Sequence, residues 1–211
     1  MKRRLKAGRG MRRRRAGLAG LAVWAAAAVL VSCVRAPPPS GLAAGTAGRP
    51  LAIRQIDPDR DAAEVQRIEE LRARLPEKYR RRGNFAWAAA RIEGLDKTEY
   101  FAHSGIQRLG KISAKAAGDI SGISLRPRNG RFEVLCVNHN DEVNGTNCFF
   151  RNADTERKII EDIAKRMRDP AAAGDIRLYT DLYPCASCRH VMCQFLAAYT
   201  NVRIQVLFRE R

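Results

Sequence analysis

Two cysteines near the carboxyl end of the chain have the spacing for metal chemistry. They lie in Pro184-Cys185-Ala186-Ser187-Cys188, where a strand pattern changes to a helical one. Pro184 favours an extended residue before it and ends the strand. Cys185 and Cys188 then fall in the first turn of a helix, where free N–H groups and the helix dipole stabilise thiolates. Two such thiolates can hold one zinc ion, but a zinc site needs further ligands.

Two acidic residues at the start of the preceding predicted helix complete the pattern. Asp154 and Glu156 are separated by Thr155, and Glu156 lies 29 residues before Cys185. That interval accommodates one helix, one loop and one strand, so both helix starts can face each other at one sheet edge. Zinc deaminases place a ligand, a spacer and a non-ligand Glu upstream of Pro-Cys-x-x-Cys. The spacing predicts zinc on Asp154, Cys185 and Cys188, and Glu156 as the catalytic proton carrier.

Each of these residues has an alternative interpretation. Asp154 is also a favoured helix N-cap, in which case a distant histidine completes the metal site or none does. Glu156 suits the dipole of a first helical turn without any catalytic role. Cys-x-x-Cys also marks thiol oxidoreductases. However, only 23 residues follow Cys188 and none is proline, whereas thioredoxin-type motifs come early and precede a cis-proline loop. A further alternative is a lipoprotein with a structural zinc clip that binds envelope partners.

The elements that must position these residues follow from periodicity. Apolar residues at helical spacing predict helices, and alternation or short apolar runs predict strands. The predicted helices are 61–75, 155–167 and 185–198, and the predicted strands are 84–92, 99–103, 131–137, 176–182 and 202–208. Residues 105–130 and 138–147 are predicted loops, and Cys136 and Cys148, which flank the second, can form a disulfide in an exported protein. Alternating strands and helices predict an α/β sandwich with right-handed crossovers.

The amino-terminal segment is predicted to be an export signal. Residues 1–32 contain nine Lys and Arg and no acid, and an apolar stretch follows at 16–31. This is the layout of a signal peptide. Leu30-Val31-Ser32-Cys33 resembles a bacterial lipobox, so residues 1–33 are predicted to be removed or lipidated at Cys33. A short transmembrane anchor and a start at Met11 are alternatives. The protein is therefore expected to be an envelope lipoprotein or secreted.

Composition then divides the rest of the chain. Residues 34–58 are rich in Pro, Gly and Ala and are predicted to be a linker, followed by a domain at 59–211 with its core at about 83–208. A content of 45% hydrophobic and 29% charged residues excludes a wholly disordered or fibrous chain. The net charge of +17 favours polyanionic partners such as nucleic acid or a membrane surface. Aromatic residues make up 7%, which gives no indication of a base-stacking surface.

Several stretches resemble the cytidine-deaminase-like superfamily, and specifically the deaminase domains of bacterial polymorphic toxins. The resemblance covers about residues 66–208 and is carried by 71–75, Gly83-Asn84-Phe85-Ala86, Ala102-His103-Ser104, 150–156 and Leu178-Tyr179-Thr180 leading into Pro184-Cys185. It implies a three-layer fold: a mixed sheet flanked by helices, with two zinc-bearing helix N-termini. The sequence departs from the superfamily at Asp154, where most members have His or Cys.

The resemblance also implies an activity. It is the zinc-dependent hydrolytic deamination of a nucleobase, cytosine to uracil, in nucleic acid or nucleotide. Asn84, Thr155 and Pro184 are then expected at the substrate. An exported enzyme finds no nucleic acid in an envelope, so the resemblance implies delivery into another cell and an immunity protein that protects the producer. Membrane contact is expected only through the amino-terminal anchor or signal.

Overall fold

The computed structural model describes residues 50–209. The predicted signal peptide, its Cys33 and most of the predicted linker lie outside the described residues. Within residues 50–209, no helix has the length and apolar character needed to cross a membrane.

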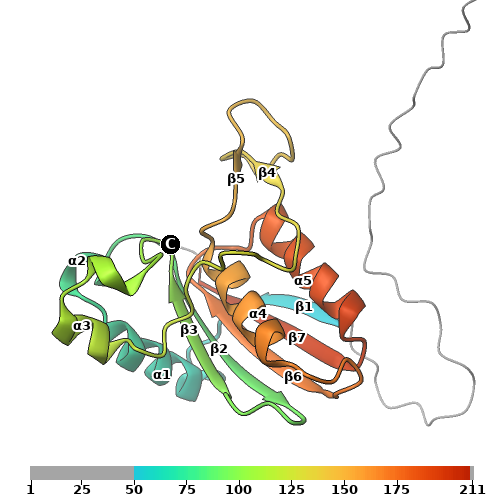
Figure 1. The fold of residues 1–211 in the computed structure, drawn as a ribbon, viewed down its shortest axis with the longest axis horizontal. Helices are drawn as coiled ribbons and strands as arrows, with labels where there is room; N and C mark the ends of the chain where they lie inside the picture. Colours follow the sequence, from blue (N-terminus) through green and yellow to red (C-terminus); the bar gives the residue numbers. More distant parts are fainter. Residues whose placement is uncertain (1–49, 210–211) are drawn as a thin grey trace, which may run out of the picture. The chain divides into compact units, whose positions relative to one another are not determined.

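A five-stranded mixed sheet forms the centre of the domain (Figure 1). Its strands, in spatial order, are β1 (Leu51–Gln55), β7 (Val202–Phe208), β6 (Gly174–Thr180), β2 (Phe85–Ile92) and β3 (Glu99–His103). β1, β7 and β6 are parallel, whereas β2 runs antiparallel to both β6 and β3. The predicted strands at 84–92, 99–103, 176–182 and 202–208 are thus confirmed to within about two residues at their ends.

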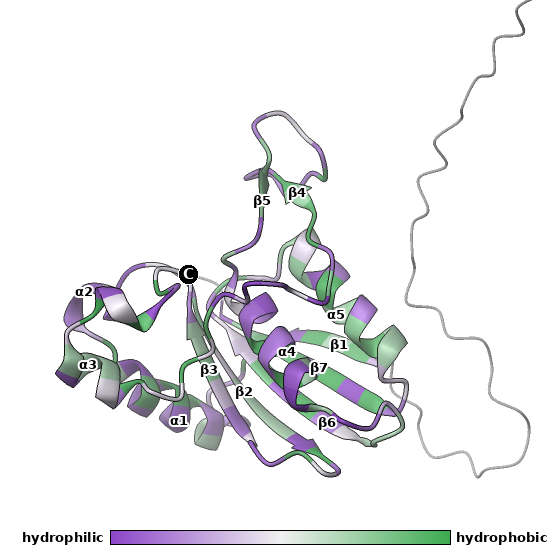
Figure 2. Ribbon diagram, in the orientation of Figure 1, coloured by the Kyte–Doolittle hydropathy of each residue, from purple (hydrophilic) through white to green (hydrophobic). Residues whose placement is uncertain are grey.

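Helices cover both faces of this sheet, which gives three layers. One face carries α4 (Thr155–Arg166) and α5 (Ala186–Ala198), and the other carries α1 (Ala62–Ala73) with the short helices α2 (Glu77–Arg80) and α3 (Ala114–Asp119) and the turn η1 (Leu109–Lys111). The strands are largely apolar, whereas α4 and α1 carry many hydrophilic residues (Figure 2). The predicted mixed α/β architecture is confirmed.

Strand β2 shows why the sheet is buried on both sides. Ala86, Ala88 and Ala90 pack in the core beneath α4 and α5, whereas Phe85 and Trp87 pack in the second core against α1. A strand that is covered on both faces becomes a continuous apolar run, as this segment is.

The folded domain starts earlier than predicted. Residues 51–55, assigned to the linker by composition, form edge strand β1 parallel to β7. The Arg54 guanidinium holds both carboxylate oxygens of Asp61 at 2.6 Å, which fixes the strand to the segment before α1. The linker prediction to residue 58 is wrong because pairing with β7, rather than local composition, makes these residues a strand.

The strand predicted at 131–137 is also wrong for most of its length. Only β4 (Cys136–Val137) is a strand, and it pairs with β5 (Phe149–Phe150) in a separate two-stranded sheet. The N–H groups of residues 131 and 132 donate instead to the Glu161 carboxylate, and that of Leu135 donates to the Ser187 hydroxyl. Side chains of α4 and α5 therefore replace a sheet ladder along this extended segment.

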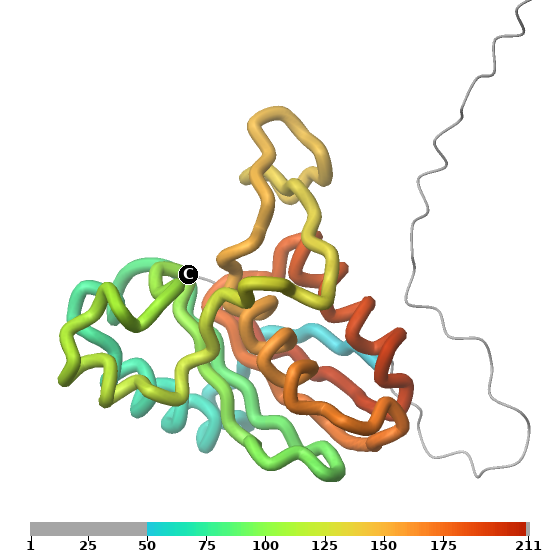
Figure 3. The backbone as a smooth tube through the Cα atoms, viewed as in Figure 1, coloured from blue at the N-terminus to red at the C-terminus, as the bar shows by residue number. Residues whose placement is uncertain are grey.

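Residues 136–150, here named the arm, extend away from the sheet as a hairpin (Figure 3). A disulfide between Cys136 and Cys148 closes its base, with the two Cα atoms 5.3 Å apart. The sequence left this disulfide as a possibility, and the structure contains it. Asp141, Asn144 and Asn147 have φ angles of about 60°, which Asn and Asp tolerate better than other side chains.

Candidate active site

Four element ends meet at one edge of the sheet. Thr180 ends β6, Asn84 immediately precedes β2, and α4 and α5 both begin there. In the antiparallel register, Ala86 of β2 lies opposite Thr180, so the start of one strand meets the end of the other. The sequence prediction that both helix starts share an edge of the sheet is confirmed.

Three metal-binding side chains lie at this edge. Asp154 Oδ2 is 3.4 Å from the Sγ atoms of both Cys185 and Cys188, and the two sulfurs are 3.5 Å apart. Around one tetrahedral zinc, bonds of about 2.3 Å to sulfur and about 2.1 Å to oxygen place ligand atoms about 3.6–3.8 Å apart. The observed spacing is close to this value. Both cysteines are free thiols.

Asp154 stands at the N-cap position of α4 but does not cap it. Its backbone is extended, and its side chain makes no hydrogen bond to the first turn of the helix. The carboxylate faces the two sulfurs instead, which contradicts the alternative in which Asp154 serves only as a cap.

Histidine is not part of this cluster in the described chain. His103 is buried, its Nε2 lies 2.7 Å from the Arg82 carbonyl, and its Nδ1 accepts from the N–H of Gly105. Both ring nitrogens of His103 are therefore occupied, and the alternative of a distant histidine ligand finds no support.

Glu156 lies beside the cluster and is almost completely buried. The hydroxyls of Thr155 and Thr180 each donate to one of its carboxylate oxygens at 2.9 Å. Its Oε2 is 3.5 Å from Cys188 Sγ. Burial, and secondarily the charge of Asp154, raises the pKa of the Glu156 carboxyl. The neighbouring Cys185, together with burial, raises the pKa of the Cys188 thiol.

Asn84 orients the two threonines. Its Nδ2 donates to Thr155 Oγ1 at 2.8 Å and to Thr180 Oγ1 at 2.9 Å. Each hydroxyl thus accepts from Asn84 and donates to Glu156, so the direction of every hydrogen bond in the network is determined. Asn84 Oδ1 is 3.4 Å from Thr180 Oγ1, whose only proton is directed to Glu156. Asn84 Oδ1 is therefore the one hydrogen-bond acceptor that receives no donor within this network.

The three residues expected at the substrate differ in position. Asn84 lines the pocket above the cluster. Thr155 is fully buried behind Glu156, so its side chain positions the carboxylate and does not reach a substrate. Pro184 is also buried, and its carbonyl accepts a hydrogen bond of 2.6 Å from Arg189. Neither Thr155 nor Pro184 lines the pocket, whereas Asp154, Glu156 and both cysteines of the same helix starts do.

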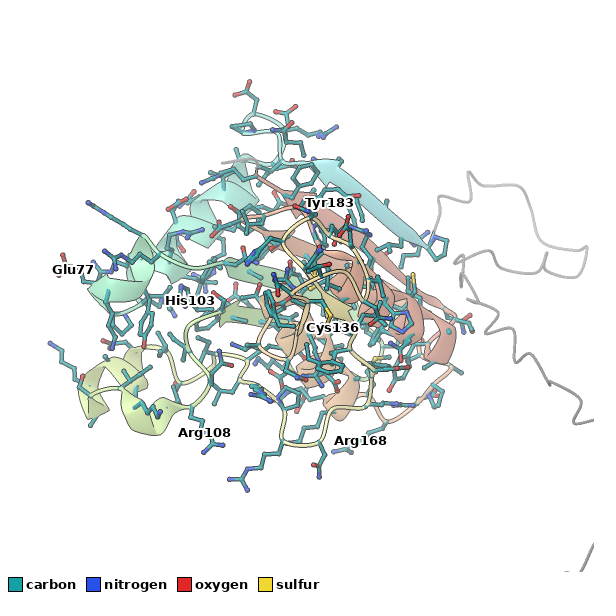
Figure 4. All side chains as sticks on the ribbon, turned by 90° about the horizontal axis from the view of Figure 1, so that it is seen from above. Glu77, His103, Arg108, Cys136, Arg168 and Tyr183 are labelled. Atoms are coloured by element: carbon teal, nitrogen blue, oxygen red, sulfur yellow. A yellow bond between two sulfur atoms is a disulfide. The ribbon has the colours of Figure 1, made fainter. Side chains whose placement is uncertain are left out.

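The pocket has a volume of about 680 Å³, and sequence reasoning missed much of its wall. Asn138, His139 and Asp141 of the arm, and Arg151 just after it, form one side, and Leu182 and Tyr183 form another. In the view of Figure 4, Tyr183 and Cys136 lie over the middle of the domain and His103 lies to one side. No periodic pattern reveals the loop residues, because their position depends on how the arm folds back.

Asp141 shows how the arm is attached to the site. Its carboxylate accepts from the N–H of Ala186 in the first turn of α5, and it pairs with Arg189 at 2.8 Å. A residue of the arm thus satisfies a free N–H of the helix that carries both cysteines. The arm is therefore fixed by hydrogen bonds to the helix that carries the two cysteines of the cluster.

The donor set fits a zinc ion. Two thiolate sulfurs and one carboxylate oxygen are typical zinc ligands, and three protein ligands leave the fourth tetrahedral position open, as in catalytic sites. Asp154, Cys185 and Cys188 would hold the ion, and all three line a pocket that also contains the buried Glu156 carboxylate.

Comparison with known proteins agrees with this arrangement. No curated protein and no solved structure gives a significant match to the chain. A family model named Toxin-deaminase, described as the BURPS668_1122 family of deaminases, matches residues 68–210. That range is more than half of the chain and includes Asn84, Asp154, Glu156 and both cysteines. The chain therefore belongs to the BURPS668_1122 family of deaminases, a family of toxin deaminases.

Proposed function

We propose that this deaminase is a zinc-dependent hydrolase that converts cytosine to uracil and releases ammonia. The observation that carries the proposal is the position of Glu156. Its carboxylate is held by two hydroxyls next to a sulfur and oxygen cluster with zinc spacing, at the bottom of an open pocket. Cytosine, rather than adenine, is proposed from the superfamily resemblance.

Glu156 would move the protons of the reaction. It accepts a proton from the water that attacks C4 of the base and donates it to N3. A second proton then passes from the new C4 hydroxyl through Glu156 to the leaving amino group, so water and cytosine become uracil and ammonia. Thr155 and Thr180 keep both carboxylate oxygens in place during these transfers. Asn84, with one acceptor left, would hold a donor group of the base or sugar.

Asp154, Cys185 and Cys188 would hold the zinc ion. When bound there, zinc supplies Lewis acidity that makes water nucleophilic near neutral pH. The carboxylate in place of the more common His or Cys would keep the site negatively charged, which favours a divalent cation.

The proposal that the chain is exported and the proposal that it is a toxin depend on each other. The basic and apolar segment at 1–33 would direct the chain out of the producing cell, with Cys33 as the site of lipidation if the lipobox is used. Nucleic acid or nucleotide is then reached only by delivery into another cell. We expect an immunity protein in the producer for the same reason.

The test combines metal content with turnover. Purified wild type and Glu156→Gln are compared for zinc per chain, for thermal unfolding, and for uracil formation from single-stranded DNA, duplex DNA, RNA and cytidine nucleotides. Adenine-containing substrates belong in the same panel. Glu156→Gln should keep zinc and fold, because both threonine hydroxyls can still donate to the amide oxygen or accept from its nitrogen. Its rate should fall by about 100- to 10,000-fold.

Three results would contradict the proposal. Wild-type turnover by a zinc-loaded Glu156→Gln protein would exclude Glu156 as the proton carrier. Zinc without turnover of any substrate would favour a structural clip, and thiol–disulfide exchange without zinc would favour an oxidoreductase.

A further inference from the structure

A second cavity lies beside the active pocket and is lined by positive charge. Its volume is about 630 Å³, and its walls contain no carboxylate. Four exposed cations line it, namely Arg108, Lys111, Arg126 and Arg128. None of the four forms an ion pair or side-chain hydrogen bond with any residue in the described part of the chain, unlike Arg54 or Arg67 elsewhere. Cations gathered without partners are available to bind an anionic ligand.

This basic groove, defined as the cavity lined by those four cations, has a lining residue next in sequence to one of the active pocket. Ser104 lines the active pocket and the next residue, Gly105, lines the groove. Within residues 50–209, Gln107 Oε1 is a buried oxygen without a hydrogen-bond partner, and Gln107 also lines the groove. Figure 4 shows the Arg108 side chain extending outward from the domain, in the same part of the view as His103. The linings of the two cavities therefore adjoin at Ser104 and Gly105, just after β3.

Exposed apolar side chains lie on the arm and on the wall of the active pocket. The large apolar residues exposed in the described chain are Val143, Phe149, Phe150, Leu182 and Tyr183, all on the arm or directly before Pro184. Arg151 lies 4.2 Å from the ring centre of Phe149, and Arg189 lies 5.4 Å from that of Tyr183. The low aromatic content of the chain concealed this surface, because the position of the rings matters more than their number.

Phosphate-binding cations next to aromatic rings are the two components of single-strand recognition. Cations follow the backbone and rings stack on bases without regard to sequence. A free nucleotide carries its phosphates on one sugar and would leave most of a separate groove of this size unused. In addition, a base must leave its stack to approach the buried Glu156, which is easiest in a single strand.

We propose that the substrate is a single-stranded polynucleotide whose flanking phosphates lie along the basic groove and whose neighbouring bases stack on Tyr183 and Phe149. This inference rests on the proposed deaminase function and adds the substrate class. DNA and RNA share the recognised chemistry, so both are included in the test.

The test compares two variants that each lose two positive charges. The groove variant is Arg108→Ala/Arg126→Ala. The matched control is Arg91→Ala/Lys165→Ala, whose residues are exposed and form no ion pair within residues 50–209. Arg91 lies near the end of β2 away from Asn84, and Lys165 lies in the last turn of α4, away from the site. Fluorescence anisotropy measures binding of labelled 12-nucleotide DNA and RNA across salt concentrations, and uracil release is measured on the same oligonucleotides and on cytidine monophosphate.

The groove variant should bind oligonucleotides about tenfold more weakly than wild type at low salt. Its slope of log K against log salt should decrease by about 1.4, which corresponds to two lost single-strand phosphate contacts. The control should retain wild-type binding, and neither variant should lose zinc. The affinities for labelled DNA and for labelled RNA, measured side by side, give the preference for one nucleic acid over the other.

The outcomes separate this inference from the proposed function. Equal turnover of cytidine monophosphate and oligonucleotide, equal turnover of duplex and single strand, or equal binding by groove variant and control would overturn the inference while deaminase activity stands. Absence of turnover on every substrate would contradict the proposed function, and the binding comparison would still decide whether the groove holds a polynucleotide.

Discussion

The floor of the active pocket consists of side chains at the ends of β2, β6, α4 and α5, whereas its outer wall is formed by the arm. The floor is buried and cross-linked by side chains from distant parts of the chain, such as Asn84, Thr180 and Glu156. The tip of the arm is exposed, and the arm is held by its buried base at Val137 and Asn138, by its disulfide and by the contacts of the Asp141 carboxylate with α5.

The groups proposed to react lie on the packed floor, whereas groups proposed to recognise the substrate lie on the exposed arm. Catalytic groups need positions accurate to about half an ångström, which packed helices and strands provide. A surface that accepts varied sequences needs exposed rings and cations, which a hairpin can present at little cost to the core. Changes in the floor should therefore abolish turnover, and changes in the arm should mainly weaken substrate binding.

The largest effect is expected at Asp154 in the floor. Loss of a residue that only supports a metal ligand typically lowers metal affinity by about 10- to 100-fold. Asp154→Asn removes a ligand itself, so zinc affinity should fall by more than this. Turnover should be lost together with the zinc. The Asp154 side chain makes no cap hydrogen bond that Asn would remove, so the stability of α4 should be unchanged. Zinc titration with a chromophoric chelator measures the affinity.

A second substitution at the same position provides the control. Asp154→His replaces the carboxylate with the more usual ligand of the superfamily and should retain zinc. Wild-type zinc affinity in Asp154→Asn would show that the carboxylate is not a ligand and that the floor holds its metal in another way.

A smaller effect is expected at Thr180, which positions Glu156. Thr180→Val removes the donor to Glu156 Oε1 and the acceptor for Asn84. A hydrogen bond to a charged group contributes about 1.5–3 kcal/mol, so kcat should fall by about 10- to 100-fold while zinc content and KM change little. Thr180→Ser keeps the hydroxyl and should restore most of kcat. A loss shared equally by Val and Ser would indicate damaged packing instead of a lost hydrogen bond.

The sequence predicted that Asp154, Glu156 and the two cysteines meet, because these residues adjoin elements with strong periodicity. Asp154 and Cys185 immediately precede helices whose apolar faces are regular, and crossover geometry places both helix starts at one edge of the sheet. Thr180 was missed as a site residue since its contact with Glu156 depends on strand register and on side-chain direction, which one sequence does not specify.

The arm and the edge strand could not be predicted in the same way. Residues 131–135 alternate like a strand, but side chains of α4 and α5 bind their N–H groups, so the pattern indicated an extended segment without a sheet. Strand β1 is too short to predict beside a Pro- and Gly-rich stretch, and it forms because β7 offers an open edge. In both places tertiary partners override the local pattern.

A still smaller effect on turnover is expected when the disulfide of the arm is removed. Cys136→Ser/Cys148→Ser frees the base of the arm but leaves Asp154, Glu156 and the zinc ligands in place. Oligonucleotide KM should rise by about threefold to tenfold, because closure of a loop of this length is worth about 3 kcal/mol of ordering. Zinc content should not change. A large loss of zinc would show that the arm maintains the floor, and that the two regions are not separable.

The last prediction concerns acid stability, which lies outside both regions and should leave turnover at neutral pH unchanged. The Arg54 guanidinium lowers the pKa of Asp61 to about 2, whereas an unfolded Asp titrates near about 3.9. Because the folded pKa is the lower one, the ionised pair stabilises the fold fully above about pH 5, and this contribution is lost as pH falls from about 4 to about 2. Between pH 6 and pH 3 the loss should amount to about 1 kcal/mol of unfolding free energy in wild type, because the folded pKa of about 2 lies below that range, and it should be absent in Asp61→Asn. Urea unfolding at pH 6 and pH 3 measures it, with the exposed Asp59→Asn as control. Parallel pH dependence in wild type and Asp61→Asn would show that Arg54 does not anchor β1 through this carboxylate, and that the edge strand is held by its pairing with β7 alone.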